Sequence, residues 1–286
     1  MSQEKVKLIE CPRDAMQGIK EFIPTATKVN YINQLLKVGF DTLDVGSFVS
    51  PKAIPQLKDT AEVLNQIDSS STKLLTIIAN ERGAKDAVNF EQIDYLGYPF
   101  SLSETFQQRN TNASIDESLG RVEAIQNLAQ KHHKKMVLYL SMGFGNPYGD
   151  PYHEDIVAKW IDKLSQLEIG VFALSDTIGV AKPDLIQRLF STLIPEYPKL
   201  EIGAHFHTTP DTWKEKVEVA YQNGCLRFDG AIAGYGGCPM AADELTGNMP
   251  TENLLAYFKE KSVELGIDET EFVAAKEMAE SMFAIK

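Results

Sequence analysis

Hydrophobic residues in this chain form short continuous runs that alternate with longer runs of helical period. Eight of the short runs are rich in Val, Ile, Leu and Phe, which is typical of strands covered by helices on their outer faces. The predicted strands are residues 6–11, 42–46, 73–79, 93–99, 136–144, 171–176, 201–208 and 226–232. The predicted helices are residues 25–38, 83–90, 114–133, 154–167, 184–194 and 211–223, with a less distinct one at 60–67 and two more at 251–265 and 269–283.

This alternation predicts an α/β protein, and the number of strands favours a closed (β/α)8 TIM barrel. An open doubly wound sheet is the alternative, and it usually carries a glycine-rich phosphate turn after its first strand. Here the first strand is followed by Pro12-Arg13-Asp14 instead. We therefore expect a single catalytic domain over residues 1–286, with the barrel at about 5–250 and additional C-terminal helices at about 251–286.

Composition limits the classes of function. The 286 residues fit one large barrel domain, and a formal net charge of −12 argues against a general nucleic-acid-binding protein. No run of 18 apolar residues predicts a membrane helix, and the N-terminus shows no apolar segment of the kind that signal peptides carry. The three cysteines show no paired spacing, so we expect a reducing, cytoplasmic location without membrane contact.

The most informative chemistry lies on the seventh predicted strand. Side chains alternate along a strand, so His205 and His207 share one face. Two histidines with a carboxylate form a common site for a divalent cation, and Asp14 at the end of the first strand is the best candidate. Asn248 could add an amide oxygen, and this donor set suits Mg²⁺ or Mn²⁺, with Zn²⁺ or Co²⁺ as alternatives. A purely structural histidine pair is the competing interpretation.

Three further groups are candidates at the strand ends. Asp44 lies in an apolar strand and needs a partner, for which Arg13 is suitable. Asp176, at the end of the sixth predicted strand, would need a partner for the same reason, although it could instead cap the next helix. Cys238 lies beside two glycines in a loop, where a reactive thiol is plausible, whereas a free cysteine is more often a small buried side chain.

The order of these motifs along the chain resembles the 3-hydroxy-3-methylglutaryl-CoA lyases, which are TIM-barrel metallolyases. The resemblance covers nearly the whole chain. Its motifs are Pro12-Arg13-Asp14 with Gln17, Ser47-Phe48-Val49-Ser50-Pro51-Lys52 with Pro55-Gln56, Asp176-Thr177-Ile178-Gly179, His205-x-His207, Ala233-Gly234 with Gly236-Gly237-Cys238-Pro239, and Gly247-Asn248 with Thr251-Glu252.

The resemblance implies metal-dependent cleavage of 3-hydroxy-3-methylglutaryl-CoA to acetoacetate and acetyl-CoA by a homodimer, in leucine degradation or ketone-body formation. It implies metal ligands at Asp14, His205, His207 and Asn248. Catalytic roles follow for Arg13, Asp14, His205 and Cys238, with Glu252 in support, and roles near the substrate for Gln17, Asp44, Lys52, Asp176 and Thr177.

These residues suggest a retro-Claisen mechanism. Asp14 or His205 would take the proton of the substrate's tertiary alcohol, and Arg13 would stabilise negative charge on the thioester oxygen. Cys238 would protonate the departing enolate from a loop hinged on glycine. Lys52, Arg82 and Arg109 are candidates for contacts with the phosphates of CoA.

The chain also departs from the family pattern. Asp44 stands where Glu is usual, Cys11 and Ala15 stand where Gly is usual, and residues 142–148 and 208–210 differ as well. The loop from Cys238 to Asn248 is one residue longer than usual. We expect several of these positions to line the substrate pocket and to affect the choice of acyl group.

Three other functions compete with this one. Claisen synthases of the isopropylmalate type share the barrel, the Arg-Asp pair and the two histidines, but typically lack the Gly-Gly-Cys-Pro loop. A 4-hydroxy-2-oxoacid aldolase fits less well. A non-catalytic binding protein of this fold would have lost some of the metal-ligating residues, and all the expected ones are present.

Overall fold

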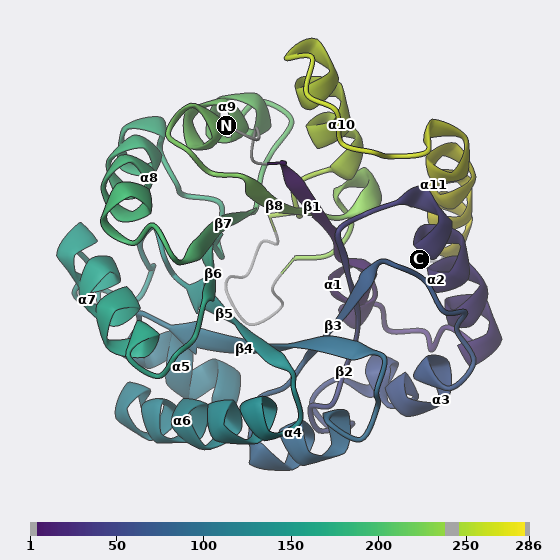
Figure 1. Ribbon diagram of the computed structural model, residues 1–286, viewed down its shortest axis with the longest axis horizontal. Helices are drawn as coiled ribbons and strands as arrows, with labels where there is room; N and C mark the ends of the chain where they lie inside the picture. Colours follow the sequence, from purple (N-terminus) through teal and green to yellow (C-terminus); the bar gives the residue numbers. More distant parts are fainter. Residues whose placement is uncertain (1–4, 238–245, 284–286) are drawn as a thin grey trace.

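The fold is a closed barrel of eight parallel strands in the order β1 to β8, as predicted. It is seen in a computed structural model that describes residues 5–237 and 246–283. Figure 1 looks down the barrel, with the strands at the centre and the helices around them. The strands are β1 Lys7–Glu10, β2 Thr42–Ser47, β3 Lys73–Ile77, β4 Ile93–Ser101, β5 Lys135–Ser141, β6 Val171–Asp176, β7 Glu201–Phe206 and β8 Arg227–Gly230.

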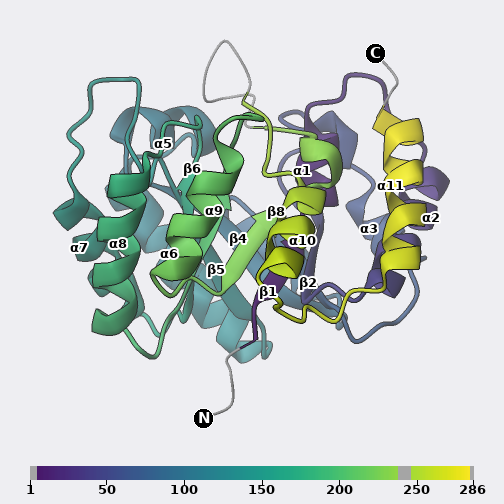
Figure 2. The same cartoon turned by 90° about the horizontal axis from the view of Figure 1, so that it is seen from above.

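Helices follow the strands and form the outer layer (Figure 2). They are α1 Pro12–Gln17, α2 Thr25–Val38, α3 Thr60–Leu64, α4 Glu81–Ala87, α5 Glu104–Thr111, α6 Ile115–Lys131, α7 Glu154–Ser165, α8 Pro183–Glu196, α9 Trp213–Gln222, α10 Thr251–Glu260 and α11 Glu269–Phe283, with 3₁₀ turns η1 Pro55–Leu57 and η2 Ile232–Gly234. Among the described residues, no helix is long and apolar enough to cross a membrane.

Local sequence explains several of these boundaries. Ser114 caps α6, accepting from the Glu117 backbone, while the Glu117 side chain accepts from the Ser114 backbone in a capping box. Gly39 ends α2 in the left-handed conformation, with φ of 93°, which glycine adopts without a steric penalty. Asn80 caps α4 by accepting from the Gly83 backbone at 3.0 Å.

The structure corrects the predicted elements in several places. The short helices α1 and α5 were not predicted, because neither is long enough to show a clear helical period. The fifth strand was predicted to reach Phe144 but ends at Ser141, where Met142 takes a left-handed φ of 57°. The helix predicted at 251–265 ends at Glu260.

The alternation of side chains along the strands separates the barrel interior from the layer under the helices. Alternate residues of β3 to β6 form an apolar cluster of their own, which comprises Leu75, Ile77, Tyr95, Val137, Tyr139, Val171 and Ala173. Their neighbours along the same strands, such as Leu96 and Phe172, belong to the large cluster that includes the helices. The interior side of β7 and β8 is polar instead, with His205, Arg227 and Asp229.

The last helix, α11, packs against α2, and the two lie side by side in both views (Figures 1 and 2). Tyr31 meets Phe283 edge to face with the ring centroids 5.8 Å apart, and Phe40 meets Phe272 at 6.5 Å. Gln34 adds a hydrogen bond from its Nε2 to Oε2 of Glu271, at 2.6 Å. These contacts anchor the C-terminal helix to the barrel wall.

Glu10 joins the first strand to the segment after the last one. Its fully buried carboxyl group bonds to the backbone N–H of Ile232 at 2.9 Å and to the hydroxyl of Thr251. Burial raises the pKa of Glu10 from 4.5 to about 8, and the two hydrogen bonds only partly offset this rise.

This shift predicts that stability falls as pH rises from 4.5 to 8. Over that interval the folded protein keeps a proton on Glu10 that the unfolded chain releases, so ionisation favours unfolding. Gln at this position keeps the shape and does not titrate. We expect Glu10→Gln to gain stability relative to the original chain as pH rises, by about 1.4 kcal/mol for each unit of pKa difference. Urea unfolding at both ends of the interval measures this.

Glu277→Gln on the exposed side of α11 is the matched control and should leave the pH dependence unchanged. A difference between Glu10→Gln and the original chain that is constant with pH would contradict the assignment.

Candidate active site

A cavity of about 390 Å³ opens at the C-terminal ends of the strands. One wall carries polar side chains predicted from the sequence, namely Arg13, Asp14, Gln17, Thr177, His205 and His207. The rest of the lining includes the apolar side chains of Val49, Ile54, Ile77, Pro99, Phe106 and Tyr139, together with small polar residues such as Asn80, Asn110 and Asn112. The cavity therefore offers a charged end for chemistry and an apolar surface for a carbon chain.

Asp14, His205 and His207 converge at the charged end. Each offers one possible ligand atom, and these atoms all lie within 4.8 Å of one another. Asp14 and His207 are buried, and the His205 side chain keeps only 12% of its surface exposed. Two nitrogens and a carboxylate oxygen in this arrangement are suited to a divalent cation that keeps open positions for substrate.

His207 shows that this group fits a metal ion. Its Nδ1 is buried and has no hydrogen-bond partner among the described residues. A buried polar atom without a partner is rare, and a cation would supply the missing contact. Burial, followed by the neighbouring His205, lowers the pKa of His207 to about 4, so the ring is neutral near pH 7 and able to act as a ligand.

The other two members of the group have opposite pKa shifts. Burial alone would raise the pKa of Asp14, but Arg13 and the two histidines lower it below its ordinary value. Burial alone would lower the pKa of His205, but the hydrogen bond to Asp229 and the charges of Asp229 and Asp14 raise it. The site thus favours an ionised carboxylate beside a histidine that binds a proton readily.

Arg13 holds the carboxylates in place. Its Nε and Nη2 donate to Oδ2 of Asp44 at 2.9 and 2.5 Å, and its Nη1 donates to Oδ1 of Asp14 and to Gln17 at 3.0 Å each. Gln17 also donates to Asp14. The predicted pairing of Arg13 with Asp44 is confirmed. Burial raises the pKa of Asp44 to about 6, although Arg13 opposes the rise.

Asn248 lies beside the group, as expected. Its backbone forms a bridge with His207, and its side chain hydrogen-bonds to Asp14 and donates to the Tyr235 carbonyl at 2.8 Å. A Cβ on Gly236 would lie 2.5 Å from the Asp14 carbonyl oxygen, so only glycine fits at position 236, beside Asp14. Ligation by the amide oxygen of Asn248 stays a prediction.

Besides Asp44 and Asn248, the predicted residues Lys52, Asp176 and Glu252 do not line the cavity. Lys52 is exposed, although Ser50 and Ala53 on either side of it line the wall. Asp176 is buried and bound to Lys216 Nζ at 2.6 Å, and it accepts the Ala181 backbone N–H near the start of the next helix. Glu252 accepts from the Ala233 backbone and pairs with Lys276 at 3.1 Å. Their functional roles stay predictions.

Cys238 lies outside the described residues, and its proposed chemistry stays a prediction.

The departures from the family pattern were expected to line the pocket, and for the described residues this was wrong. Residues 142–148 and 208–210, with Cys11 and Ala15, are absent from the cavity wall. Asn146 is occupied in its own turn, where it accepts from the backbones of Tyr148 and Asp150. Thr208 donates its backbone N–H to Gly247. Asp44 reaches the site only through Arg13.

Sequence reasoning missed Asp229. Its Oδ2 lies 3.1 Å from Nδ1 of His205, and its side chain is fully buried. Arg227 and Asp229 alternate on the eighth strand, so two opposite charges on the same face of an otherwise apolar strand were the available signal.

Comparison with known proteins places this geometry in a family. The HMGL-like family model matches residues 5–279. The chain belongs to the HMGL-like family. A hydroxymethylglutaryl-CoA lyase of Bacillus subtilis is 33% identical over 273 residues, which cover 95% of this chain and 91% of the relative. A 3-hydroxy-3-isohexenylglutaryl-CoA/hydroxymethylglutaryl-CoA lyase of Pseudomonas aeruginosa is 32% identical over 93% of this chain and 88% of its own length.

Solved structures agree with this placement. The structure of an HMG-CoA lyase of Bacillus subtilis has a TM-score of 0.92 at 31% identity, covering 99% of this chain and 95% of that one. An HMG-CoA lyase of Acinetobacter baumannii, in complex with coenzyme A and 3-methylmalate, has a TM-score of 0.91 at 29% identity, covering 99% and 93%.

The donor set predicts that the chain binds a divalent cation through His207. Truncation to Ala removes one of the two ring-nitrogen ligands, and we expect His207→Ala to weaken Mn²⁺ binding by at least about 10-fold. Titration of metal-free protein, followed by electron paramagnetic resonance of free Mn²⁺, measures the affinity.

His153→Ala is the control, because His153 is an exposed histidine on the cap of α7. Equal affinities of the two variants would argue against this site.

Proposed function

We propose that this chain is a divalent-metal-dependent carbon–carbon lyase that cleaves 3-hydroxy-3-methylglutaryl-CoA to acetoacetate and acetyl-CoA. The observation that carries the proposal is the convergence of Asp14, His205 and His207 beside Arg13, at the charged end of a cavity with an apolar wall. Membership of the HMGL-like family and the names of the relatives support the reaction and the substrate.

Asp14, His205, His207 and Asn248 would hold the cation. A divalent cation bound there would supply Lewis acidity that lowers the pKa of the substrate's tertiary hydroxyl. We propose Mg²⁺ or Mn²⁺, because a carboxylate and an amide oxygen make up half of the donor set.

The residues of the chain have distinct tasks in a retro-Claisen cleavage. Asp14 or His205 accepts the hydroxyl proton, since both line the cavity. As the C2–C3 bond breaks, its electron pair passes into the acetyl-CoA fragment, which leaves as an enolate while the alcohol carbon becomes the ketone of acetoacetate. Arg13 stabilises the negative charge on the thioester oxygen. Cys238 is proposed to return a proton to the enolate carbon, which completes acetyl-CoA.

Arg13 has a position that serves both fold and chemistry. Asp44 accepts two hydrogen bonds from the Arg13 guanidinium, so the orientation of the guanidinium is fixed before the substrate binds. A preorganised cation aimed at developing charge stabilises a transition state without reorganisation. The apolar wall of Val49, Ile54 and Phe106 is suited to the carbon chain of the thioester.

Some finer features rest on the resemblance and on composition. We propose a homodimer, a role in leucine degradation and a cytoplasmic location. The bacterial relatives and the low cysteine content support the location.

The decisive experiment is a turnover assay with 3-hydroxy-3-methylglutaryl-CoA and metal-loaded protein, following release of acetoacetate. We expect release that stops with a chelator and returns when Mg²⁺ or Mn²⁺ is added. Folded, metal-loaded protein that releases no acetoacetate would overturn the proposal. Condensation of acetyl-CoA with a keto acid by the same protein would assign the synthase direction instead.

Arg13→Lys tests the role of the guanidinium. Lys keeps the positive charge that Asp14 and Asp44 require, but it loses the planar arrangement of donors. We expect kcat to fall by about 10²- to 10³-fold, the range for removing one donor to a developing oxyanion. Arg188→Lys, at an exposed ion pair with Glu154, is the matched control and should leave kcat unchanged. A normal kcat in Arg13→Lys would remove this role.

A further inference from the structure

A series of buried charged side chains extends into the barrel from the proposed metal-binding group, which comprises Asp14, His205 and His207. Asp229 Oδ2 lies 3.1 Å from His205 Nδ1, and its other oxygen lies 3.9 Å from Nε of Arg227. Nη1 of Arg227 then pairs with Glu201 at 3.1 Å. Asp229 and Arg227 have 0% and 1% of their side-chain surface exposed. The proposed mechanism uses neither residue.

The register of the sheet creates this series. His205 of β7 lies opposite Asp229 of β8 in the parallel ladder, so the two side chains meet inside the barrel. Arg227 lies two residues earlier on the same side of β8. Its alkyl chain crosses Gly203, where an added Cβ would lie 2.7 Å from Cδ of Arg227. The glycine on β7 therefore leaves the space that the buried arginine occupies.

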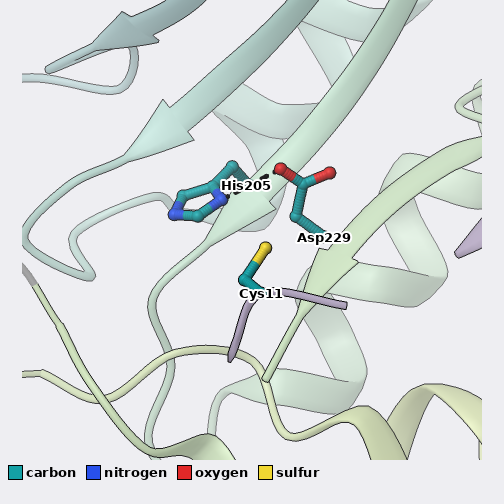
Figure 3. A group of neighbouring side chains, drawn as sticks. All are labelled: Cys11, His205 and Asp229. Carbon is teal, nitrogen blue, oxygen red and sulfur yellow. Dashed lines mark hydrogen bonds and ion pairs between the residues drawn. The ribbon is translucent and has the colours of Figure 1, made fainter. Parts of the chain in front are cut away.

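Figure 3 shows how the side chains of Cys11, His205 and Asp229 lie. The carboxylate of Asp229 points at one ring nitrogen of His205, and the thiol of Cys11 lies beside them. The second ring nitrogen, Nε2, faces the opposite way and lies 3.9 Å from Oδ2 of Asp14. His205 thus stands between Asp229 on one side and the metal-binding group on the other.

Cys11, His205 and Asp229 could themselves be taken for a metal site, since their ligand atoms lie close together. The chemistry favours a hydrogen bond instead. Burial and the nearby carboxylates raise the pKa of the Cys11 thiol well above its ordinary value, which disfavours the thiolate that a metal requires. Oδ2 of Asp229 already interacts with the imidazole at 3.1 Å, and the Arg227 guanidinium places its positive charge 3.9 Å from Oδ1 without a hydrogen bond.

We propose that Asp229 is a positioning residue for His205, accepting the Nδ1 hydrogen so that the lone pair of Nε2 faces Asp14 and His207, and that Arg227 holds Asp229 in place. The proposal rests on the metal site put forward above. A histidine that binds metal commonly donates its other ring N–H to a carboxylate, which fixes both the tautomer and the orientation of the ring. Arg227 supplies the opposite charge that a carboxylate buried in the barrel requires.

The test uses Asp229→Asn, which keeps the shape of the side chain but offers an amide N–H to Nδ1. A donor at this place favours the other tautomer, with the hydrogen on Nε2, where it blocks the lone pair. We expect Mn²⁺ affinity to fall by about 10- to 100-fold. We also expect the ¹⁵N shifts of the His205 ring, recorded without metal at a pH where the ring is neutral, to show the exchanged tautomer.

Three further variants complete the experiment. Arg227→Lys keeps the charge and should retain most of the Mn²⁺ affinity, whereas Arg227→Met should lose affinity as Asp229→Asn does. Cys11→Ala removes the thiol without touching the hydrogen bond and should bind one Mn²⁺ with unchanged affinity. A Cys11→Ala protein that binds one ion where the original chain binds two would assign a second metal site in place of the proposal.

The outcomes separate this proposal from the proposed function. An original chain whose neutral His205 carries its hydrogen on Nε2 would overturn the positioning role, even if Asp229→Asn failed to fold. Unchanged affinity and tautomer in folded Asp229→Asn would do the same. Absence of lyase activity with intact Mn²⁺ binding would overturn the function alone, since neither affinity nor tautomer depends on the substrate.

Discussion

The site depends on the hydrogen bonds that the Arg13 guanidinium donates to two carboxylates. Arg13 lies on α1 directly after β1 and binds Asp44 of β2 and Asp14 of its own helix with short hydrogen bonds. A carboxylate buried without a partner is costly, and removing one partner of a buried pair leaves that cost uncompensated. One arginine therefore makes it possible to keep Asp44 in the apolar barrel and Asp14 ionised at the cavity wall. It also joins the first two strands at the face where chemistry takes place.

The barrel interior is divided between two kinds of packing. On β3 to β6 it is filled by an apolar cluster that includes Leu75 and Val137, and two members of the same cluster, Ile77 and Tyr139, line the cavity. On β7 and β8 it holds His205, Asp229 and Arg227, whose charges alternate and compensate one another. This division explains why the polar ligands gather at one side of the cavity. It also leaves the opposite side free for a carbon chain, as a thioester substrate requires.

The departures from the family pattern have a smaller effect on the cavity than their number suggests. The described ones contact backbone around the site or hold loops, as Asn146 and Thr208 do, and stay away from the cavity wall. Asp44 in place of the usual Glu still reaches Arg13, because the guanidinium extends toward β2. The pocket therefore keeps the arrangement expected for the reaction while the surrounding loops vary.

The sequence by itself determined the barrel, most strand positions and the candidate metal ligands, because the succession of apolar runs and helical periods and the spacing of His205 and His207 are local patterns that can be read without tertiary knowledge. It also indicated the partner of Asp44, since a lone carboxylate in an apolar strand needs a cation. Only the tertiary structure decided that Asp229 meets His205, that Asp176 binds Lys216, and that residues 142–148 stay off the cavity wall. These depend on the register between neighbouring strands and on the directions of loops, which are set by packing across the whole barrel, so that no single segment of the chain identifies the partner.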